Sequence, residues 1–572
     1  MRRFISPKWC AAALVAAMCA MVANVPDARG YGIEPAGARH AMVASTSEIA
    51  SSVGSDILRK GGNATDAAVA VALALAVVWP SAGNLGGGGF LLYRGADGQS
   101  EVIDYRERAP LGAKRDMYLD AKGKVVPEAS SVGYLAAGVP GTVAGLAMAH
   151  KRHGRLPWAD LVAPAERLAR EGIVVDRHLA QSLADAAPRL ARFDDSRAIF
   201  LRDGKPLAPG DRLIQPDLAA TLARIARDPA DFYSGETARR LVADMAAHGG
   251  LVSAADLKEY APTIRAPLKG RYRGYDILTM PPPSSGGILL LQILGMLESR
   301  DVAALGFHSA DEIHLLVEAM RRSFADRGAL LGDTDFVKVP VRGLLAPAYI
   351  AARGKTIDMA RATPSSAIGG GDPAPFEKPE TTHFSVVDAE GAAVSNTYTL
   401  NGSFGAAAVA RGTGVLLNNE MDDFASAPGA PNMYGLIQGE ANAIAPRKRP
   451  LSTMTPTMLL KDGKLVFALG SPGGPTIVNT VLQIIVNLVD FRMNLRQAIE
   501  APRIHHQHLP DQIIWEPFGL TKEMKAALEA RGHVFAPQPR YIGDAQAVGI
   551  ESGTGVRVGA SDPRLGGAPA GY

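Results

Sequence analysis

The pattern of apolar and polar positions along the chain predicts a protein that mixes helices with strands. Residues 48–60 have helical periodicity, and a glycine pair ends the predicted helix. The next predicted helix, 67–79, begins after a cap at Thr65 or Asp66 and is apolar on almost every face. A helix that is apolar all round is typical of a buried position, so we expect it between two layers of structure.

Strands are predicted where apolar and polar residues alternate, near residues 90–93 and 102–105. From Pro157 to about Arg353 the pattern is mostly helical, with no repeat of fixed period. The chain therefore reads as a mixed α/β protein.

The sharpest change in composition is the stretch ATPSSAIGGGDPAPFEKPE at 362–380. Pro, Gly and Ser dominate it, so it is predicted to be an exposed, poorly ordered loop. Two β-rich runs, THFSVVD and AVSNTYTL, follow and are joined by a short turn at 389–391, which predicts a hairpin. A flexible loop that ends at a hairpin is a natural place for a chain to be cut, although an interdomain linker is the simpler interpretation.

The first thirty residues predict an export signal. Basic residues at the start are followed by an apolar, uncharged run at 10–22, which is shorter than the roughly 20 residues that cross a bilayer. Cleavage is expected after Ala23 or after Gly30. Both cysteines, Cys10 and Cys19, lie within this leader. The mature protein would have none, which excludes a cysteine nucleophile, disulfides and thiolate metal sites.

Composition narrows the class of protein further. The 572 residues are 47% hydrophobic and 20% charged, which excludes a wholly disordered chain, and the length suffices for more than one domain. The formal net charge of +3 equals the charge of Arg2, Arg3 and Lys8, so the chain without its leader is formally neutral. With no basic stripe left, a nucleic-acid partner is not expected.

Thr381 stands where the loop meets the first strand of the hairpin. A threonine hydroxyl is a weak nucleophile unless a base lies beside it, and a threonine that begins a chain can use its own α-amino group. That group titrates at about 7.7–8, so it can accept and return a proton near neutral pH. Because most threonines that open a strand are structural, this position alone does not identify catalysis.

Several motifs in a fixed order carry a resemblance that covers essentially the whole mature chain. The sequence resembles the γ-glutamyltransferase (γ-glutamyl transpeptidase) family of N-terminal nucleophile hydrolases. The motifs are NLGGGGF at 84–90, DYRERAP at 104–110, PPPSSGG at 281–287, TTHFS at 381–385, NNEMDDF at 418–424, RPLST at 449–453 and LGSPGG at 469–474. The resemblance implies a four-layer αββα sandwich, in which two central sheets are covered by helices.

The resemblance also implies a precursor that cuts itself between Glu380 and Thr381. A large subunit of residues 31–380 and a small subunit of residues 381–572 would then share one core as a heterodimer. Thr381 would be the nucleophile, and Thr399 on the partner strand would orient its hydroxyl. Gly473 and Gly474 match the oxyanion hole, and the local pattern of strand, tight turn and helix start agrees, because N–H groups at a helix start favour negative charge.

Residues for binding the glutamyl group follow from the same resemblance. Its α-carboxylate would be bound by a guanidinium and two hydroxyls, and its α-ammonium by acidic and amide side chains. Thr453 departs from the serine expected at its position. A loop at 428–446 resembles the lid over the pocket. The implied residues are Arg106, Ser452 and Thr453 for the carboxylate, Asn401, Glu420 and Asp423 for the ammonium, and Tyr434 as the gate.

The implied reaction is transfer of a γ-glutamyl group from glutathione or a related amide to water, an amino acid or a peptide. No cofactor or metal is expected. The histidines of RIHHQH, at 503–508, are too close together to reach one ion easily. The enzyme would be exported to the periplasm or secreted, without a membrane span. Two alternatives stay open: a glutaryl-cephalosporin acylase of the same fold, and an uncleaved, inactive envelope binding homologue.

Overall fold

The computed structural model describes residues 33–372, 383–427 and 429–572. Residues Pro35–Tyr572 form one compact unit. The predicted leader and the predicted cleavage pair, Glu380 and Thr381, lie outside the described residues. Within the described ranges, no helix has both the length and the apolar character needed to cross a membrane.

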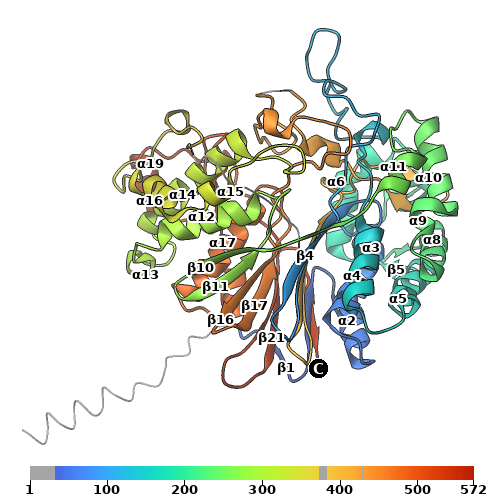
Figure 1. Ribbon diagram of the computed structural model, residues 1–572, viewed down its shortest axis with the longest axis horizontal. Coiled ribbons are helices and arrows are strands. Elements are labelled where there is room, and N and C mark those ends of the chain that lie inside the picture. Colours follow the sequence, from blue (N-terminus) through green and yellow to red (C-terminus); the bar gives the residue numbers. More distant parts are fainter. Residues whose placement is uncertain (1–32, 373–382, 428) are drawn as a thin grey trace, which may run out of the picture. The chain divides into compact units, whose positions relative to one another are not determined.

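Two seven-stranded antiparallel sheets form the centre of the unit (Figure 1). Inter-sheet contacts between β12 or β13 and β17 or β20 show that the sheets stack face to face. The first sheet has the order β1(Ala36–Ala38), β21(Arg557–Ser561), β20(Gln546–Ile550), β17(Lys464–Gly470), β16(Thr457–Lys461), β11(Tyr275–Thr279) and β10(Leu268–Tyr272). The second has the order β22(Ala568–Gly571), β2(Met42–Ser45), β12(Phe384–Val387), β13(Ala393–Thr399), β3(Gly88–Arg94), β4(Ser100–Asp104) and β9(Thr263–Arg265).

Helices cover the outer face of each sheet, as Figure 1 shows on its left and right sides. The layer over the second sheet comprises α2(Glu48–Arg59), α3(Ala64–Val78), α4(Thr142–His153), α5(Trp158–Glu171), α6(Arg177–Leu190), α7(Asp194–Phe200), α8(Pro216–Arg227), α9(Asp231–Ser234), α10(Glu236–Ala247) and α11(Ala254–Glu259). The layer over the first comprises α12(Gly286–Leu297), α13(Val302–Leu305), α14(Ala310–Leu330), α15(Val341–Leu344), α16(Pro347–Lys355), α17(Thr476–Val489), α18(Leu495–Glu500) and α19(Lys522–Ala530). The expected four-layer αββα sandwich is confirmed.

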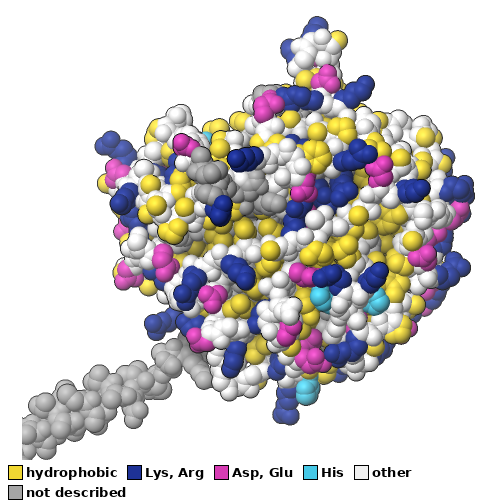
Figure 2. All heavy atoms as spheres, viewed as in Figure 1, with side chains coloured by type: hydrophobic (Ala, Val, Ile, Leu, Met, Phe, Trp, Pro, Cys, Tyr) yellow, Lys and Arg dark blue, Asp and Glu magenta, His cyan; other side chains and the backbone are white. Residues whose placement is uncertain are grey.

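Short elements complete the chain. The described residues include four short 3-10 helices, η1(Tyr134–Ala136), η2(Ser365–Ala367), η3(Glu420–Asp423) and η4(Glu440–Asn442). Four two-stranded pairs are β5(Ile173–Val174) with β8(Arg212–Leu213), β6(Leu201–Arg202) with β7(Lys205–Pro206), β14(Val409–Ala410) with β15(Val415–Leu416), and β18(Ile504–His505) with β19(Ile514–Trp515). On the face drawn in Figure 2, basic and acidic side chains are interspersed.

The apolar helix α3 lies where its sequence predicts. Every residue of Ala64–Val78 is buried, and the helix packs against α2, α4 and α5 on one side and against β12 and β13 on the other. Its cap differs from the prediction, because Asn63 begins the helix rather than Thr65 or Asp66. The Asn63 side chain accepts hydrogen bonds from the N–H groups of Thr65 and Asp66, and the Asp66 carboxylate accepts one from the Asn63 N–H.

The predicted hairpin is confirmed as β12 and β13, with Phe384 opposite Asn396 and Val387 opposite Ala393. It forms the middle of the second sheet, since β12 also pairs with β2 and β13 with β3. Strands from before and after residue 380 are therefore interleaved within one hydrogen-bonded sheet. The subunit boundary itself stays a prediction.

Two local predictions hold only in part. The stretch 157–353 is mostly helical, as predicted, but it also contains short strands, β5 to β8 and β9 to β11. In addition, the described part of the predicted exposed loop is partly anchored, because Ser365 is only 2% exposed. Its N–H donates to Asp511 Oδ2 at 2.7 Å, and Arg321 Nη1 donates to its hydroxyl at 2.8 Å. Arg321 is buried and paired with Asp511, and the two residues hold Ser365 in place although the surrounding composition is that of an exposed loop.

Candidate active site

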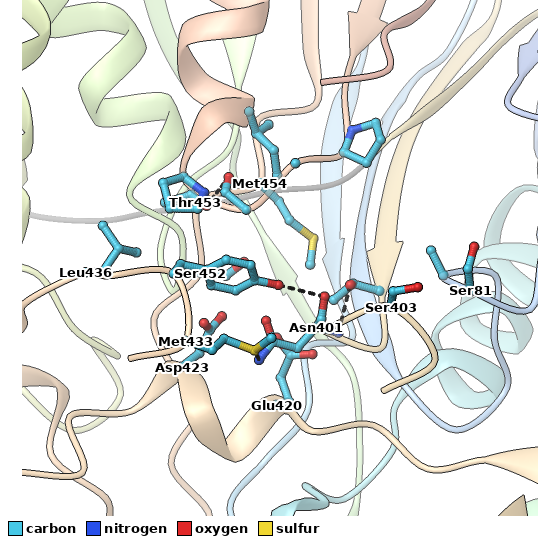
Figure 3. Close-up of a pocket in the computed structure, with 18 of the residues that line it drawn as sticks. Ser81, Asn401, Ser403, Glu420, Asp423, Met433, Leu436, Ser452, Thr453 and Met454 are labelled. Atoms are coloured by element: carbon cyan, nitrogen blue, oxygen red, sulfur yellow. Dashed lines mark hydrogen bonds between the residues drawn. The ribbon is translucent and has the colours of Figure 1, made fainter. Parts of the chain in front are cut away.

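A cavity of about 500 Å³ gathers most of the predicted site residues. In the view of Figure 3, Leu436 lies at one end and Ser81 at the other, with Asp423, Ser452 and Thr453 toward the Leu436 end. Glu380 and Thr381 lie outside the described residues. The predicted residues that line the cavity are Thr399, Asn401, Glu420, Asp423, Tyr434, Ser452, Thr453, Gly473 and Gly474.

Thr399 ends β13, and the chain then turns sharply at Asn401. The Asn401 backbone has a φ of 72°, in the left-handed region that asparagine tolerates better than most residues. The turn is held because the Asn401 N–H donates to the Thr399 hydroxyl at 2.8 Å. The Asn401 side chain donates to the carbonyl of Asn419 at 3.0 Å. This contact fixes the Asn401 turn beside η3, which carries the predicted acidic residues.

The glycine pair lies between β17 and the first turn of α17, as the sequence predicts. Both residues have positive φ, 134° at Gly473 and 56° at Gly474, which favours glycine at these positions. Their carbonyls accept bonds from the N–H groups of Thr476 and Ile477, as the helix begins. Among the described residues, no acceptor takes the N–H of Gly473 or Gly474. Two donors at a helix start are therefore available to a negative oxygen in the cavity.

The hydroxyl pair is joined to this glycine turn. Thr453 Oγ1 donates to the carbonyl of Gly474 at 2.8 Å. The Ser452 carbonyl accepts hydrogen bonds from the N–H and the hydroxyl of Ser285, at the start of α12. Thr453, which is predicted to bind the carboxylate, is thus hydrogen-bonded to the glycine turn that is predicted to form the oxyanion hole.

Arg106 is fully buried at the end of β4, behind the acidic residues of η3. Its guanidinium contacts Glu420 through Nη1, and Nη2 donates to Asp423 Oδ2 at 2.7 Å. The residue predicted to anchor a carboxylate is therefore paired with the two acids predicted to bind the ammonium. Glu420 and Asp423 line the cavity and Arg106 does not. Direct contact between Arg106 and a substrate stays a prediction.

Tyr434 belongs to the loop predicted as a lid. Its hydroxyl donates to the carbonyl of Asn401 at 2.8 Å, and Gln507 donates to its backbone carbonyl at 3.1 Å. A Cβ added at Gly474 would lie 3.1 Å from the Tyr434 ring, so the ring covers the glycine turn. In this structure the Tyr434 side chain forms part of the cavity wall.

The histidines near the site are neutral partners in hydrogen bonds. Burial lowers the pKa of His383 well below its usual value, and its ring nitrogens contact the hydroxyls of Ser385 and Ser395. Burial also lowers the pKa of His505 to about 3 and of His506 to about 4. A buried imidazole that resists protonation is a poor candidate for the general base.

Several cavity residues were missed by sequence reasoning. Their residue types are ordinary for a core or a loop, so the sequence alone carries little signal for them. Four examples from outside the motifs are Ser81 after α3, Ser182 in α6, Arg540 before β20 and Leu565 after β21.

Two antiparallel sheets stacked between helical layers form the αββα sandwich that is typical of the N-terminal nucleophile hydrolases. Comparison with known proteins gives the particular family. The profile described as Gamma-glutamyltranspeptidase matches residues 50–572, and the chain belongs to this family. It is an enzyme of the γ-glutamyltransferase class.

Individual relatives agree with this assignment. The chain is 47% identical over 562 residues to the glutathione hydrolase proenzyme of Escherichia coli K12, covering 97% of this chain and 96% of that protein. It is 41% identical to the acylase ACY 1 proenzyme of Pseudomonas sp. V22, over 94% of each chain. The crystal structure of a cephalosporin acylase from Bacillus halodurans superposes with a TM-score of 0.85 at 28% identity, covering 96% of this chain and 99% of that one.

Proposed function

We propose that this chain is an exported precursor that cuts itself before Thr381 and then transfers γ-glutamyl groups from glutathione and related amides. The acceptor is water, an amino acid or a peptide. The observation that carries the proposal is the cavity itself. Acidic, hydroxyl and oxyanion-type groups line one space, as a glutamyl substrate with an ammonium, a carboxylate and a reacting carbonyl requires.

The name of the Escherichia coli relative, glutathione hydrolase proenzyme, supports both the substrate and the processing. The acylase relative is less similar, at 41% identity. Two acids in the cavity favour a substrate with an ammonium group, which a glutaryl chain lacks. They therefore support the γ-glutamyl substrate over the glutaryl one.

Self-cleavage would begin with attack of the Thr381 hydroxyl oxygen on the carbonyl carbon of Glu380. The peptide C–N bond breaks, the nitrogen takes up the hydroxyl proton and becomes the α-amino group of Thr381, and an ester joins the two residues. Water then opens the ester, giving a carboxylate on Glu380 and a free hydroxyl on Thr381. The hairpin register supports Thr399 as the orienting residue. Counting three residues back from Phe384 gives Thr381, and three forward from its partner Asn396 gives Thr399.

Transfer would then use the new amine as the base. It accepts the hydroxyl proton as the Thr381 oxygen attacks the γ-carbonyl carbon, and the N–H groups of Gly473 and Gly474 stabilise the resulting oxyanion. The protonated amine gives its proton to the leaving nitrogen, which leaves a γ-glutamyl ester on Thr381. Water or an acceptor amine attacks this ester in the second half of the reaction. Ser452 and Thr453 would bind the α-carboxylate, and Glu420 and Asp423 the α-ammonium.

Mass analysis of the purified protein, followed by an assay with a γ-glutamyl anilide, tests this proposal. The wild type should contain two fragments divided at Glu380–Thr381 and should release the aniline. Thr381→Ala should remain one inactive chain, whereas the matched control Thr382→Ala should still be cut. A purified Thr381→Ala protein that splits at the same bond would show that the mechanism is wrong. An intact and inactive wild type would favour the binding homologue.

A further inference from the structure

The part of the cavity lined by Glu420 and Asp423 is called the donor pocket here. Glu107 is a buried carboxyl beside it, and the proposed reaction gives Glu107 no role. It follows Arg106 in the chain and is fully buried. The Glu107 Oε2 atom lies 3.6 Å from Arg106 Nη1, beyond hydrogen-bond distance. A Cβ at Gly88, in β3, would lie 2.6 Å from Oε2, so a glycine there makes room for the carboxyl.

Three oxygens in this region have no hydrogen-bond donor among the described residues. They are both carboxyl oxygens of Glu107 and Oε2 of Glu420. The two side chains are close enough for a hydrogen bond between them once one of them carries a proton. Buried carboxylate oxygens without donors are costly, and one proton placed between the two groups satisfies an oxygen on each.

The charges around Glu107 can be counted group by group. Arg106 is the guanidinium that acts on it most strongly, whereas Glu420 and Asp423 add negative charge. The hydroxyls of three neighbouring tyrosines donate their hydrogen bonds to acceptors other than Glu107. Tyr105 donates to Asn396, Tyr233 to the carbonyl of Pro140, and Tyr260 to the carbonyl of Arg106. Three ionised carboxylates against one guanidinium would leave a net charge of about −2 in a buried site.

We propose that Glu107 and Glu420 share one proton, and that Glu107 is thereby a positioning residue that sets the donor pocket to accept one ammonium group. With one shared proton, Arg106, Glu107, Glu420 and Asp423 carry a net charge of −1. A single substrate ammonium then neutralises the site. This inference rests on the proposed function, since it concerns how that donor pocket recognises its substrate.

The pair should take up a second proton in mild acid. Burial raises the pKa of Glu107 to about 7, and burial raises the pKa of Glu420 well above its usual value. Because these two carboxyls titrate as a pair, the pair that holds two protons in acid should lose one of them near pH 7. Below that pH the four groups are neutral as a set. As pH rises through about 7 the set becomes negative, and ligands with an ammonium group should bind more tightly.

Competitive inhibition by L-glutamate and by glutarate isolates this step, because glutarate lacks the ammonium. Between pH 6 and pH 8, Ki for L-glutamate should fall by about 5- to 10-fold relative to Ki for glutarate in the wild type. The upper limit is about tenfold because a group with a pKa of about 7 is ionised about ten times more at pH 8 than at pH 6. In Glu107→Gln the amide donates permanently to Glu420, so the ratio should stay at its high-pH value throughout. Glu107→Gln should therefore bind L-glutamate more tightly than the wild type at pH 6.

Glu312 provides a matched control, since burial raises its pKa to about 8 in α14, outside the residues that line the cavity. Glu312→Gln should leave the ratio of Ki values unchanged. At pH 8, the infrared difference between wild type and Glu107→Gln should contain the carbonyl band of one protonated carboxyl, which shifts in D₂O.

A wild-type ratio that is flat from pH 6 to 8, or the absence of that infrared band, would overturn the proposal. The same holds if Glu107→Gln retains the wild-type profile. If Glu107→Gln does not fold, the wild-type ratio decides alone. Failure of the wild type to hydrolyse a γ-glutamyl anilide would instead reject the proposed function, and the infrared band would still test the shared proton.

Discussion

Replacing Asp423 by asparagine should separate substrates that carry an α-ammonium from those that do not. Asp423 Oδ2 is bonded to Arg106, and Oδ1 receives only a long contact of 3.4 Å from Asn432. Its side chain is 11% exposed, so an ammonium bound there would be largely removed from water. Asparagine keeps the size of the side chain and one acceptor oxygen, but it removes the charge.

The magnitude follows from the type of bond that is lost. A hydrogen bond to a charged partner contributes about 1.5–3 kcal/mol, and about 1.4 kcal/mol corresponds to a factor of ten. Asp423→Asn should therefore lower kcat/KM for a γ-glutamyl anilide by about 10- to 150-fold. The matching glutaryl anilide has no ammonium at that position, so its kcat/KM should change by less than about threefold.

Two further variants control the comparison. Asp422→Asn changes the neighbouring buried carboxylate, which is bonded to Ser130 and to the N–H of Met433 and does not line the cavity. Any loss there should be equal for both substrates. Arg106→Lys keeps the charge but cannot span both Glu420 and Asp423, so it should also reduce activity on both. Equal losses for the two anilides in Asp423→Asn would refute the assignment of this residue to the ammonium.

Two predictions concern the reacting groups. Because the α-amino group of Thr381 must be neutral to act as the base, activity should rise with pH through an apparent pKa near 8, and verified chemical blocking of that amine should abolish it. Full activity of the blocked enzyme would remove the amine from the mechanism. Gly473→Ala should lower kcat by about 10²- to 10³-fold, since a Cβ there would lie 2.4 Å from Thr476 Oγ1 and displace an oxyanion donor. Near-normal kcat in a processed Gly473→Ala protein would exclude the donor role.

The sequence predicted those parts of the site in which residue type and position are tightly linked. The pattern of a strand, a tight turn and a helix start was predicted around Gly473 and Gly474, and both residues have positive φ angles that favour glycine. The hairpin that ends at Thr399 was likewise predicted from alternation and a short turn. In both cases local physics and the family motif indicate the same structure.

Other features depend on partners that are distant in the chain. Arg106 was predicted to bind a carboxylate of the substrate, but its pairing with Glu420 and Asp423, more than three hundred residues later, was not predicted. How many groups of such a network stay ionised depends on how deeply they are buried, and a local sequence pattern does not indicate burial. Glu107 was not predicted as a site residue, because its protonation also depends on burial. The strands β9 to β11 were missed because short, half-exposed strands resemble the loops between helices.

One missed feature was available from the sequence. Asn63 and Asp66 form a capping box, in which a short polar residue at the helix start is followed three positions later by an acid. Thr65 or Asp66 was predicted as the cap, and the structure has Asn63 there instead. The reciprocal spacing is the stronger signal, since it satisfies two backbone donors at once.

A cut after residue 380 would not separate the parts of this molecule that form the site. The sheet that contains the hairpin combines strands from both sides of that position, with β12 bonded to β2 and β13 bonded to β3. The ion pairs at the donor pocket also join both sides of the cut, because Arg106 precedes it whereas Glu420 and Asp423 follow it. Loss of one partner from a buried pair of this kind costs about 3–5 kcal/mol, so dissociation of the fragments would expose both an open sheet and unpaired charges. Self-cleavage can therefore free the amine of Thr381 while the fold that positions its substrate stays intact.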